Sequence, residues 1–520
     1  MAAEWWRGSV IYQVYPRSFQ DSNGDGVGDL PGITARLGHV AALGADAVWL
    51  SPIFPSPMVD MGYDVSDYTD IDPVFGTLAD FDAMIARAHE LGLKVIIDQV
   101  LNHSSADHPF FVESRSSRDN PKADWYVWAD PKPDGDVPNN WQALFGGSAW
   151  TWDARRRQYY LHNFHAQQPD FNFWNPAVQD WLLNTMRFWL DRGVDGFRLD
   201  TVNFYFHDKE LRNNPPHPKA RSATRPFDMQ DSLFQKTRPE NIAFLERLRA
   251  LLDEYDDRTM VGEVGELVRP IETMAAYTAP GRLHMAYSFD MLGPDFTPAH
   301  FRRTVESFFA AAPGSCPCWA FSNHDVIRHA SRWAAFGPQD DLARQAAALL
   351  LTLPGSICVY QGEELGQTES DLSRAEITDP QGIAFWPDDK GRDGCRTPMV
   401  WDAAQPNGGF TTGTPWLPVK APQLARAVAG QAGNPESVLG FYRRMLALRR
   451  EEPDLRGMAV SFADTPAPVL AYTRGDGTFC AFNLSPEATD IALPRVSEVL
   501  LHQNVTATGL GPNGVLIARL

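Results

Sequence analysis

The sequence predicts an α/β fold: a (β/α)8 TIM barrel with an inserted subdomain after strand 3, a second insertion after strand 8, and a C-terminal antiparallel β-sandwich domain. Eight short runs of β-branched and apolar residues are each followed by a loop rich in Gly, Asp or Pro and then by a segment of helical periodicity. Two intervals between these units are too long to be ordinary connections. This alternation is typical of a closed parallel sheet that is covered by helices.

The eight expected strands span residues 10–14, 47–50, 95–98, 196–199, 260–263, 285–289, 319–322 and 357–360. Apolar residues recur at three- and four-residue spacings in the intervening segments, which predicts helices over 78–91, 178–191, 242–254 and 341–353. We therefore expect the barrel to comprise residues 1–102, 171–365 and 436–452.

The two long intervals, 103–170 and 366–435, follow the third and eighth strands. Loops that follow strands lie on the C-terminal face of such a barrel, so both insertions should wall an active-site cleft there. Short β-type runs separated by Gly, Asp and Pro predict the C-terminal β domain over 453–520. The Pro-rich, basic stretch 213–226 is expected to be a mobile loop, and the sequence assigns it no function.

Charge and cysteine content exclude several classes of partner. Lys and Arg number 46 against 65 Asp and Glu, and the resulting net charge of −19 disfavours binding to nucleic acid or to an anionic membrane. We see neither a secretory signal nor an apolar run long enough to span a bilayer. The odd number of cysteines, five, favours reduced thiols in the cytoplasm, and Cys316 and Cys318 lack the partners of a zinc site. A monomer or a homodimer is equally compatible with the sequence.

Ionisable residues end four of the expected strands. They are Asp98 to His103, Arg198 to Asp200, Glu263, and Asn323 to Asp325. Any one of these carboxylates alone would be better explained as a helix cap or a turn residue. Three carboxylates that converge at one barrel mouth instead form a general acid, base and nucleophile set.

These motifs resemble those of the α-amylase family of glycoside hydrolases, family 13, along almost the entire chain. They stand in order as Asp98-Gln-Val-Leu-Asn-His103, Gly196-Phe-Arg-Leu-Asp200, Gly262-Glu263 and Phe321-Ser-Asn-His-Asp325, with Gln168-Pro-Asp-Phe-Asn172 in the first insertion. Phe171 stands where the family more often has Leu. Met61-Gly-Tyr-Asp64 and Arg392-Asp-Gly-Cys-Arg-Thr-Pro-Met399 are most similar to the α-glucosidase and oligo-1,6-glucosidase branch.

The resemblance implies that Asp200 is the nucleophile, Glu263 the general acid/base and Asp325 the carboxylate that stabilises the charged transition state. Retaining hydrolysis needs the first two carboxyl groups about 5 Å apart across the glycosidic bond. Arg198 can keep Asp200 ionised, and Asp98 is expected to orient Arg198. Glu266, three residues after Glu263, is a rival acid that the family pattern disfavours.

The resemblance also implies a set of substrate contacts. Asp64 and Arg396 resemble the pair that grips the far side of the first glucose and closes the pocket, which implies exo action. The other expected contacts are Tyr63, His103, Phe145, Phe164, Arg198, Thr201 and His324. Taken singly, the two histidines would be read as core residues, and the two phenylalanines could equally be packing residues.

A second constellation is the loop Asp21-Ser-Asn23-Gly-Asp25-Gly-Val27-Gly-Asp29, whose alternating oxygen side chains could wrap a hard divalent cation. Gly32 occupies the position where a full calcium-hand loop requires Glu, so Asp29 would close a shorter loop, and an Asp/Gly turn without metal is the alternative. The loop resembles the metal loop of the α-glucosidase branch, with the Val27 carbonyl as a ligand. Structural Ca2+ is therefore expected, with Mg2+ as the alternative.

The sequence as a whole predicts a retaining exo-acting α-glucosidase that hydrolyses terminal α-1,4-linked glucose from short α-glucosides such as maltose or sucrose, with transglucosylation to sugars or alcohols. An oligo-1,6-glucosidase or a sucrose isomerase is the closest enzymatic alternative, and a catalytically dead barrel subunit of a complex is the non-enzymatic one. The resemblance connects Thr201 to linkage preference, because Thr or Ala there accompanies α-1,4 and Val accompanies α-1,6 preference.

Overall fold

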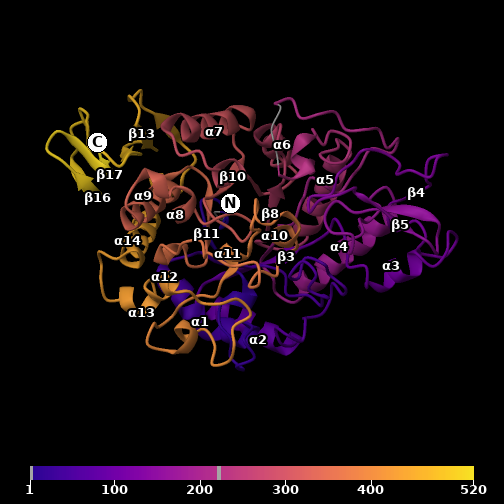
Figure 1. The fold of residues 1–520 in the computed structure, drawn as a ribbon. Coiled ribbons are helices and arrows are strands. Elements are labelled where there is room, and N and C mark those ends of the chain that lie inside the picture. The colour runs from indigo at the N-terminus through magenta and orange to yellow at the C-terminus, as the bar shows by residue number, and fades with distance from the viewer. Residues whose placement is uncertain (1–3, 220–223) are drawn as a thin grey trace.

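Eight parallel strands close into a barrel in the computed structural model, which describes residues 4–219 and 224–520 (Figure 1). Around the barrel the strands are β1 (Val10–Val14), β11 (Ser356–Tyr360), β10 (Cys316–Ala320), β9 (Met285–Ser288), β8 (Thr259–Val264), β7 (Gly196–Leu199), β3 (Lys94–Gln99) and β2 (Ala47–Leu50). All eight expected strands are present, so the predicted barrel is confirmed. Part of the 213–226 stretch, including Arg221, lies outside the described residues.

Helices follow the strands and surround the barrel (Figure 1). They are α1 (Leu30–Leu43), α2 (Leu78–Glu90), α4 (Pro176–Asp191), α5 (Asn241–Leu252), α6 (Pro270–Tyr277), α7 (Pro298–Ala311), α9 (Gln339–Thr352) and α14 (Val438–Glu451). Local capping explains where several of them begin. At α2, Thr77 and Asp80 form a reciprocal capping box, and Asn175 accepts a hydrogen bond from an amide in the first turn of α4.

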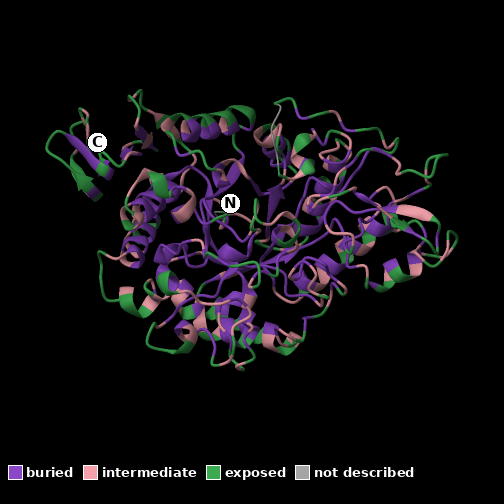
Figure 2. Ribbon diagram, viewed as in Figure 1, coloured by how far each residue is buried: buried purple, intermediate pink, exposed green. Residues whose placement is uncertain are grey.

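Two apolar layers hold the barrel, because successive side chains of a strand point to opposite faces. One layer lies between the strands and the helices and includes Val48 and Ile97. The other fills the barrel interior, where Trp49, Met285 and Cys318 are buried together. Figure 2 shows the buried residues concentrated at the centre of the molecule and the exposed ones on the outer loops and helix faces.

The first insertion carries α3 (Pro109–Ser114) and a small antiparallel sheet of β4 (Trp128–Ala129), β6 (Gln158–Leu161) and β5 (Trp150–Asp153). An isolated bridge from His103 to Asp170 joins its two ends, and a second bridge, from Tyr126 to Phe171, ties its middle to the chain that leaves it. The second insertion contains the short helices α10 (Pro380–Phe385), α11 (Asp393–Arg396), α12 (Ala421–Leu424) and α13 (Val428–Gln431), and a 3-10 helix, η6 (Pro406–Gly409). The domain boundaries themselves stay a prediction.

The C-terminal antiparallel domain is confirmed, and its strands form one connected sheet. Its order is β12 (Val460–Phe462), β13 (Val469–Arg474), β14 (Thr478–Asn483), β17 (Gly509–Arg519) and β15 (Thr489–Asp490), with β16 (Glu498–Val505) paired to β17. The sheet docks on α9, where Gln345 donates to the Asn483 carbonyl at 2.7 Å. Among the described residues, no helix has both the length and the hydropathy needed to cross a membrane.

Candidate active site

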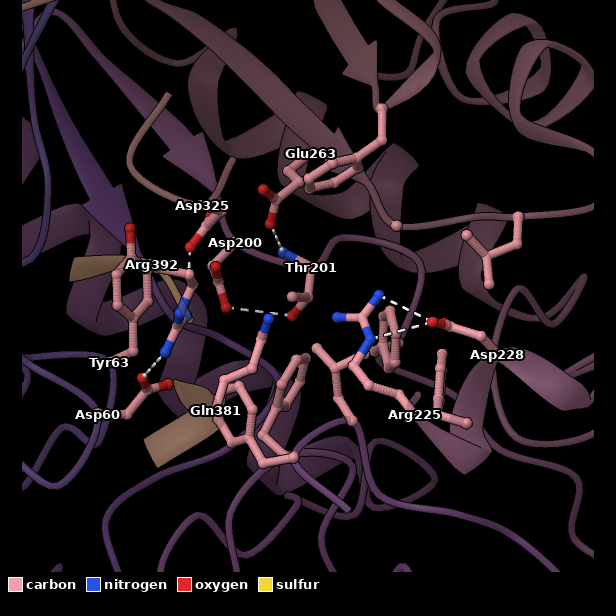
Figure 3. A pocket seen from close by; sticks show the side chains of 18 of the residues that line it. Asp60, Tyr63, Asp200, Thr201, Arg225, Asp228, Glu263, Asp325, Gln381 and Arg392 are labelled. Carbon is pink, nitrogen blue, oxygen red and sulfur yellow. Dashed lines mark hydrogen bonds and ion pairs between the residues drawn. The ribbon is translucent and has the colours of Figure 1, made fainter. Parts of the chain in front are cut away.

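A cavity of about 260 Å³ opens at the carboxyl ends of the barrel strands, and Figure 3 shows its polar residues. Residues from several strand ends and from both insertions line it: Asp60, Tyr63, His103, Leu144, Phe145, Phe164, Asp200, Thr201, Phe204, Arg225, Phe227, Asp228, Glu263, Gly265, Glu266, Leu267, Phe289, Asp325, Gln381 and Arg392. The three expected catalytic carboxylates therefore face one space. Their individual roles stay predictions.

Arg198 organises these carboxylates from beneath the cavity. It lies on β7, is fully buried, and places Nη1 2.8 Å from Oδ1 of Asp200 and Nη2 2.5 Å from Oε1 of Glu263. Asp98 on β3 accepts two hydrogen bonds from the same Nη1, at 2.9 and 3.0 Å. One rigid guanidinium thus holds the expected nucleophile and the expected acid side by side, and Asp98 fixes its orientation.

Burial governs the protonation of this pair. It raises the pKa of Asp200 to about 7 and that of Glu263 to about 7, because removal from water disfavours the charged form. The Arg198 charge opposes the effect in both residues, and each carboxylate raises the pKa of its neighbours. Because these carboxyl groups interact, they titrate together rather than independently. One carboxyl group can therefore keep a proton near neutral pH while its partner is ionised.

Asp325 lies in a different electrostatic environment. Burial alone would raise its pKa, but the neighbouring His324, Arg392 and Arg396 lower it well below the usual range. Arg392 Nη1 and Arg396 Nη2 both donate to its Oδ1, at 3.2 and 3.1 Å. A carboxylate fixed in the charged state is suited to stabilising a positively charged transition state.

The expected pair at the closed end of the pocket needs a correction. Asp64 is fully buried and accepts hydrogen bonds from Ser56 and from the main-chain amides of Val59 and Asp60, so it closes a turn of its own loop. Arg396 is also fully buried, and its contact with Asp325 supports that carboxylate from outside the cavity lining.

Asp60 and Arg392 occupy the cavity wall instead. Arg392 Nη2 donates to Asp60 Oδ1 at 2.7 Å, and the guanidinium also contacts Asp325 (Figure 3). A further contact joins it to Asp379. Gln168 adds a donor to the other Asp60 oxygen at 3.1 Å. This ion pair joins the loop after β2 to the second insertion and makes one end of the cavity polar.

Aromatic and imidazole groups form the remaining wall. Tyr63 and His103 line the cavity as expected, and the Tyr63 hydroxyl lies 2.6 Å from Nε2 of His324. His324 itself is fully buried behind Tyr63, on which its ring stacks. Burial lowers the pKa of His103 to about 3, so its imidazole is neutral and can either donate or accept.

Phe145 and Phe164 also line the cavity, and they cluster there with Phe204 and Phe227. Sequence reasoning missed the last two residues, together with Asp60, Arg225, Asp228 and Gln381. Arg392 belongs to a motif that the sequence analysis quoted, and Asp60 directly precedes another, Met61 to Asp64, which is the signal that could have found them. The residues that follow β7 carry no comparable pattern.

Thr201 lies between the two central carboxylates. Its amide donates to Glu263 Oε2 at 3.1 Å and its hydroxyl to Asp200 Oδ2 at 3.2 Å. Its φ of 42° is in the left-handed region, a strained conformation for a β-branched residue that is typical of functional sites. The hydroxyl thus contacts the expected nucleophile rather than the strand-end backbone.

The Asp/Gly loop lies apart from this cavity, directly before α1. Asp21 accepts from three main-chain amides of the loop and from Thr411, and Asp29 caps α1 through the Gly32 amide. Among the described residues, no group of three or more His, Cys, Asp or Glu side chains is arranged as a metal site. Asn23 and the Val27 carbonyl would have to complete a ligand set, and both are oxygen donors that suit a hard cation.

Comparison with known proteins agrees with this geometry. Residues 13–457 match the family model described as "Alpha amylase, catalytic domain". A probable alpha-glucosidase of Rhizobium meliloti (strain 1021) is 55% identical over 96% of this chain and 95% of the relative. An oligo-1,6-glucosidase of Parageobacillus thermoglucosidasius is 38% identical over 87% of this chain and 84% of the relative.

Solved structures extend the comparison. The alpha-glucosyl transfer enzyme XgtA is 51% identical and superposes with a TM-score of 0.96, over 99% of this chain and 100% of that one. The trehalulose synthase MutB from Pseudomonas mesoacidophila MX-45 is 34% identical, with a TM-score of 0.91 over the full length of both chains. The chain therefore belongs to the α-amylase catalytic domain family of glycoside hydrolases.

Proposed function

We propose that the protein is a retaining exo-acting α-glucosidase that releases terminal α-1,4-linked glucose from short α-glucosides such as maltose or sucrose. The observation that carries this proposal is that Asp200 and Glu263 both pair with the same guanidinium, that of buried Arg198. Two adjacent carboxyl groups, one ionised and one protonated, are what retaining hydrolysis requires. The Asp60–Arg392 ion pair at one end of the cavity supports a blind pocket for a single terminal glucose.

In this mechanism, ionised Asp200 attacks the anomeric carbon while Glu263 donates its proton to the glycosidic oxygen, and the aglycone leaves. The covalent glucosyl-enzyme then reacts with water, from which Glu263 removes a proton as the bond to Asp200 breaks. Asp325, held charged by the two arginines, stabilises positive charge on the sugar ring in both steps. Transglucosylation follows when a sugar or alcohol replaces water.

Incubation with 4-nitrophenyl α-glucoside tests the proposal. We expect release of nitrophenol and of glucose that is initially the α-anomer, as measured by proton NMR. Initial release of the β-anomer would contradict a retaining mechanism, and absence of nitrophenol would favour a catalytically dead barrel.

A second candidate is an oligo-1,6-glucosidase or a sucrose isomerase, which the similarity to the Parageobacillus enzyme and to MutB supports. Thr201, with its hydroxyl on the expected nucleophile, favours the α-1,4 specificity. Product analysis on maltose, isomaltose and sucrose separates the candidates, because an isomerase would return a rearranged disaccharide from sucrose.

We further propose that the loop from Asp21 to Asp29 binds structural Ca2+, with Mg2+ as the alternative, on the strength of its carboxylate, amide and carbonyl oxygens. A cytoplasmic location is also part of the proposal. All five cysteines are unpaired and buried, which fits a reducing compartment.

A further inference from the structure

Glu266 is a carboxylate in the cavity wall that the proposed mechanism does not use. It lies three residues after Glu263 and is 5% exposed. An ionised carboxylate accepts about four hydrogen bonds. Protein donors supply two: the Thr237 hydroxyl at 2.7 Å from Oε2 and the Val268 amide at 3.0 Å from Oε1. Each oxygen keeps acceptor capacity for a ligand in the cavity.

Glu266 is ionised, so it cannot be the rival proton donor. Burial raises its pKa, but the charge of buried Lys236 and the hydrogen bonds from Thr237 and Val268 outweigh this and leave the pKa lowered. Lys236 is anchored nearby, since its ammonium donates to the carbonyl of Gly265, the residue next to Glu266. The side chain of Asn203 also holds Gly265: its Nδ2 donates to the Gly265 carbonyl at 3.2 Å, and its Oδ1 accepts from the Gly265 amide at 3.0 Å.

The position of Glu266 identifies which part of a substrate it faces. Asp60 and Arg392 form the polar end of the cavity, where the terminal glucose is expected. A larger groove lies beside this cavity, and five residues line both: Arg225, Asp228, Leu267, Asp325 and Gln381. Leu267, the residue after Glu266, is 41% exposed, so Glu266 borders a side of the cavity that opens outward. Glu263 must face the glycosidic oxygen, and the chain continues from it to Glu266 and then Leu267 on the outward side.

We propose that Glu266 is a specificity-determining residue that accepts hydrogen bonds from hydroxyl groups of the leaving or accepting sugar. This role rests on the proposed function and gives the enzyme a preference among aglycones. Aglycones that carry hydroxyl groups, such as a second sugar, gain a charged hydrogen bond here, whereas an aryl aglycone without hydroxyl groups gains none. Lys236 and Thr237 act as positioning residues, because they fix the carboxylate and its charge without lining the cavity.

Glu266→Gln tests this inference with two substrates. We expect kcat/KM for maltose to fall by about tenfold or more, because a neutral amide is a weaker acceptor. We expect kcat/KM for 4-nitrophenyl α-glucoside to change less than about threefold. Retained activity on the aryl substrate also shows that the variant is folded. Exposed Glu272, on α6, offers a matched control: Glu272→Gln should change neither substrate.

A second variant, Thr237→Val, removes the hydroxyl that orients Glu266 and should lower the maltose-to-aryl ratio in the same direction, by a smaller factor. An equal loss on both substrates in Glu266→Gln, or an unchanged maltose value, would overturn the proposal. Failure of the proposed function would look different, because it would show in the unmodified protein: a catalytically dead barrel would cleave neither substrate, and a 1,6-specific enzyme would cleave the aryl substrate but not maltose.

Discussion

Arg392 donates from Nη2 to Oδ1 of Asp60 at 2.7 Å and so connects two segments that are more than three hundred residues apart in the chain. The same guanidinium donates from Nη1 to Asp325. The end of the cavity and one of its expected catalytic carboxylates therefore share a single cation, and the second insertion supplies it.

Replacement of either partner should weaken catalysis on natural substrates. We expect Asp60→Asn and Arg392→Gln each to lower kcat/KM for maltose by roughly a hundredfold, because buried charged groups lose their partners and the substrate loses its contacts. Asp64→Asn should instead mainly lower the melting temperature, since Asp64 holds a turn. Steady-state kinetics and thermal melting of the three variants distinguish these outcomes, and a large stability loss with normal kinetics in Arg392→Gln would contradict this assignment.

Asp200→Asn should abolish turnover while it preserves the fold. The amide keeps the shape of the side chain but cannot form the covalent intermediate, so we expect kcat to fall by roughly 10³-fold or more. Burial raises the pKa of Asp200, which means that the charged form is costly there; the neutral variant should melt at the same or a higher temperature. Near-normal hydrolysis of maltose by Asp200→Asn would refute its role as nucleophile.

The rate should depend on pH through both carboxyl groups, whose pKa values burial raises to about 7. At lower pH the nucleophile gains a proton, and at higher pH the acid loses one, so kcat/KM should pass through a maximum near neutrality. In Glu263→Gln, the alkaline decline should disappear with a dinitrophenyl α-glucoside, whose leaving group needs no proton. If the alkaline decline persists unchanged in that variant, another group is the acid.

Thr201→Val should change selectivity between linkages. The natural protein is expected to cleave maltose faster than isomaltose, and the variant should shift toward isomaltose. Both residues are β-branched, so the positive φ is equally strained in each, and the loss of the hydroxyl on Asp200 is the main change. Comparison of kcat/KM for the two disaccharides decides the matter: an unmoved ratio would exclude Thr201 as the determinant.

Removal of a divalent cation from the Asp21–Asp29 loop should destabilise the protein without changing the active-site cavity. We expect a chelator to lower the melting temperature by roughly 3 °C or more, because bound metal stabilises only the folded state. Asp25→Ala should melt lower and no longer respond to chelator. Asp25 suits this test because Asp21 already holds several loop amides. Elemental analysis that finds no metal, together with an unchanged melting curve, would reject the site.

Much of the barrel could be predicted because hydrophobic periodicity and strand-end turns are local properties of the sequence. The seventh strand is expected at 319–322, but β10 spans Cys316–Ala320 and so begins three residues earlier. The difference arises because β10 contains Pro317, and a proline, which has no backbone amide hydrogen, disfavours a strand in the sequence. Short β-type runs predict that the C-terminal domain consists of strands. Their union in one sheet depends on β17, which pairs with three different strands, and pairing of this kind is not encoded locally.

The convergence of Asp200, Glu263 and Asp325 could be predicted because each lies at or shortly after the end of a barrel strand, and strand ends meet at one face. The residues that form the other end of the cavity could not be predicted in this way. Asp60 and Asp64 lie in one loop, as Arg392 and Arg396 lie in one motif, and only the fold decides which member of each pair faces the cavity. Residues such as Phe227 come from the long connection after β7, where no periodicity relates sequence to position.

The barrel interior has one further consequence. Cys318 and Cys358 are buried there beside Trp49, and burial raises the pKa of both thiols. Such thiols are inert to alkylating reagents while the barrel is closed, since only the exposed thiolate reacts. The rate at which a water-soluble maleimide labels them therefore measures how often the barrel opens, so the enzyme carries an intrinsic chemical probe of its own unfolding.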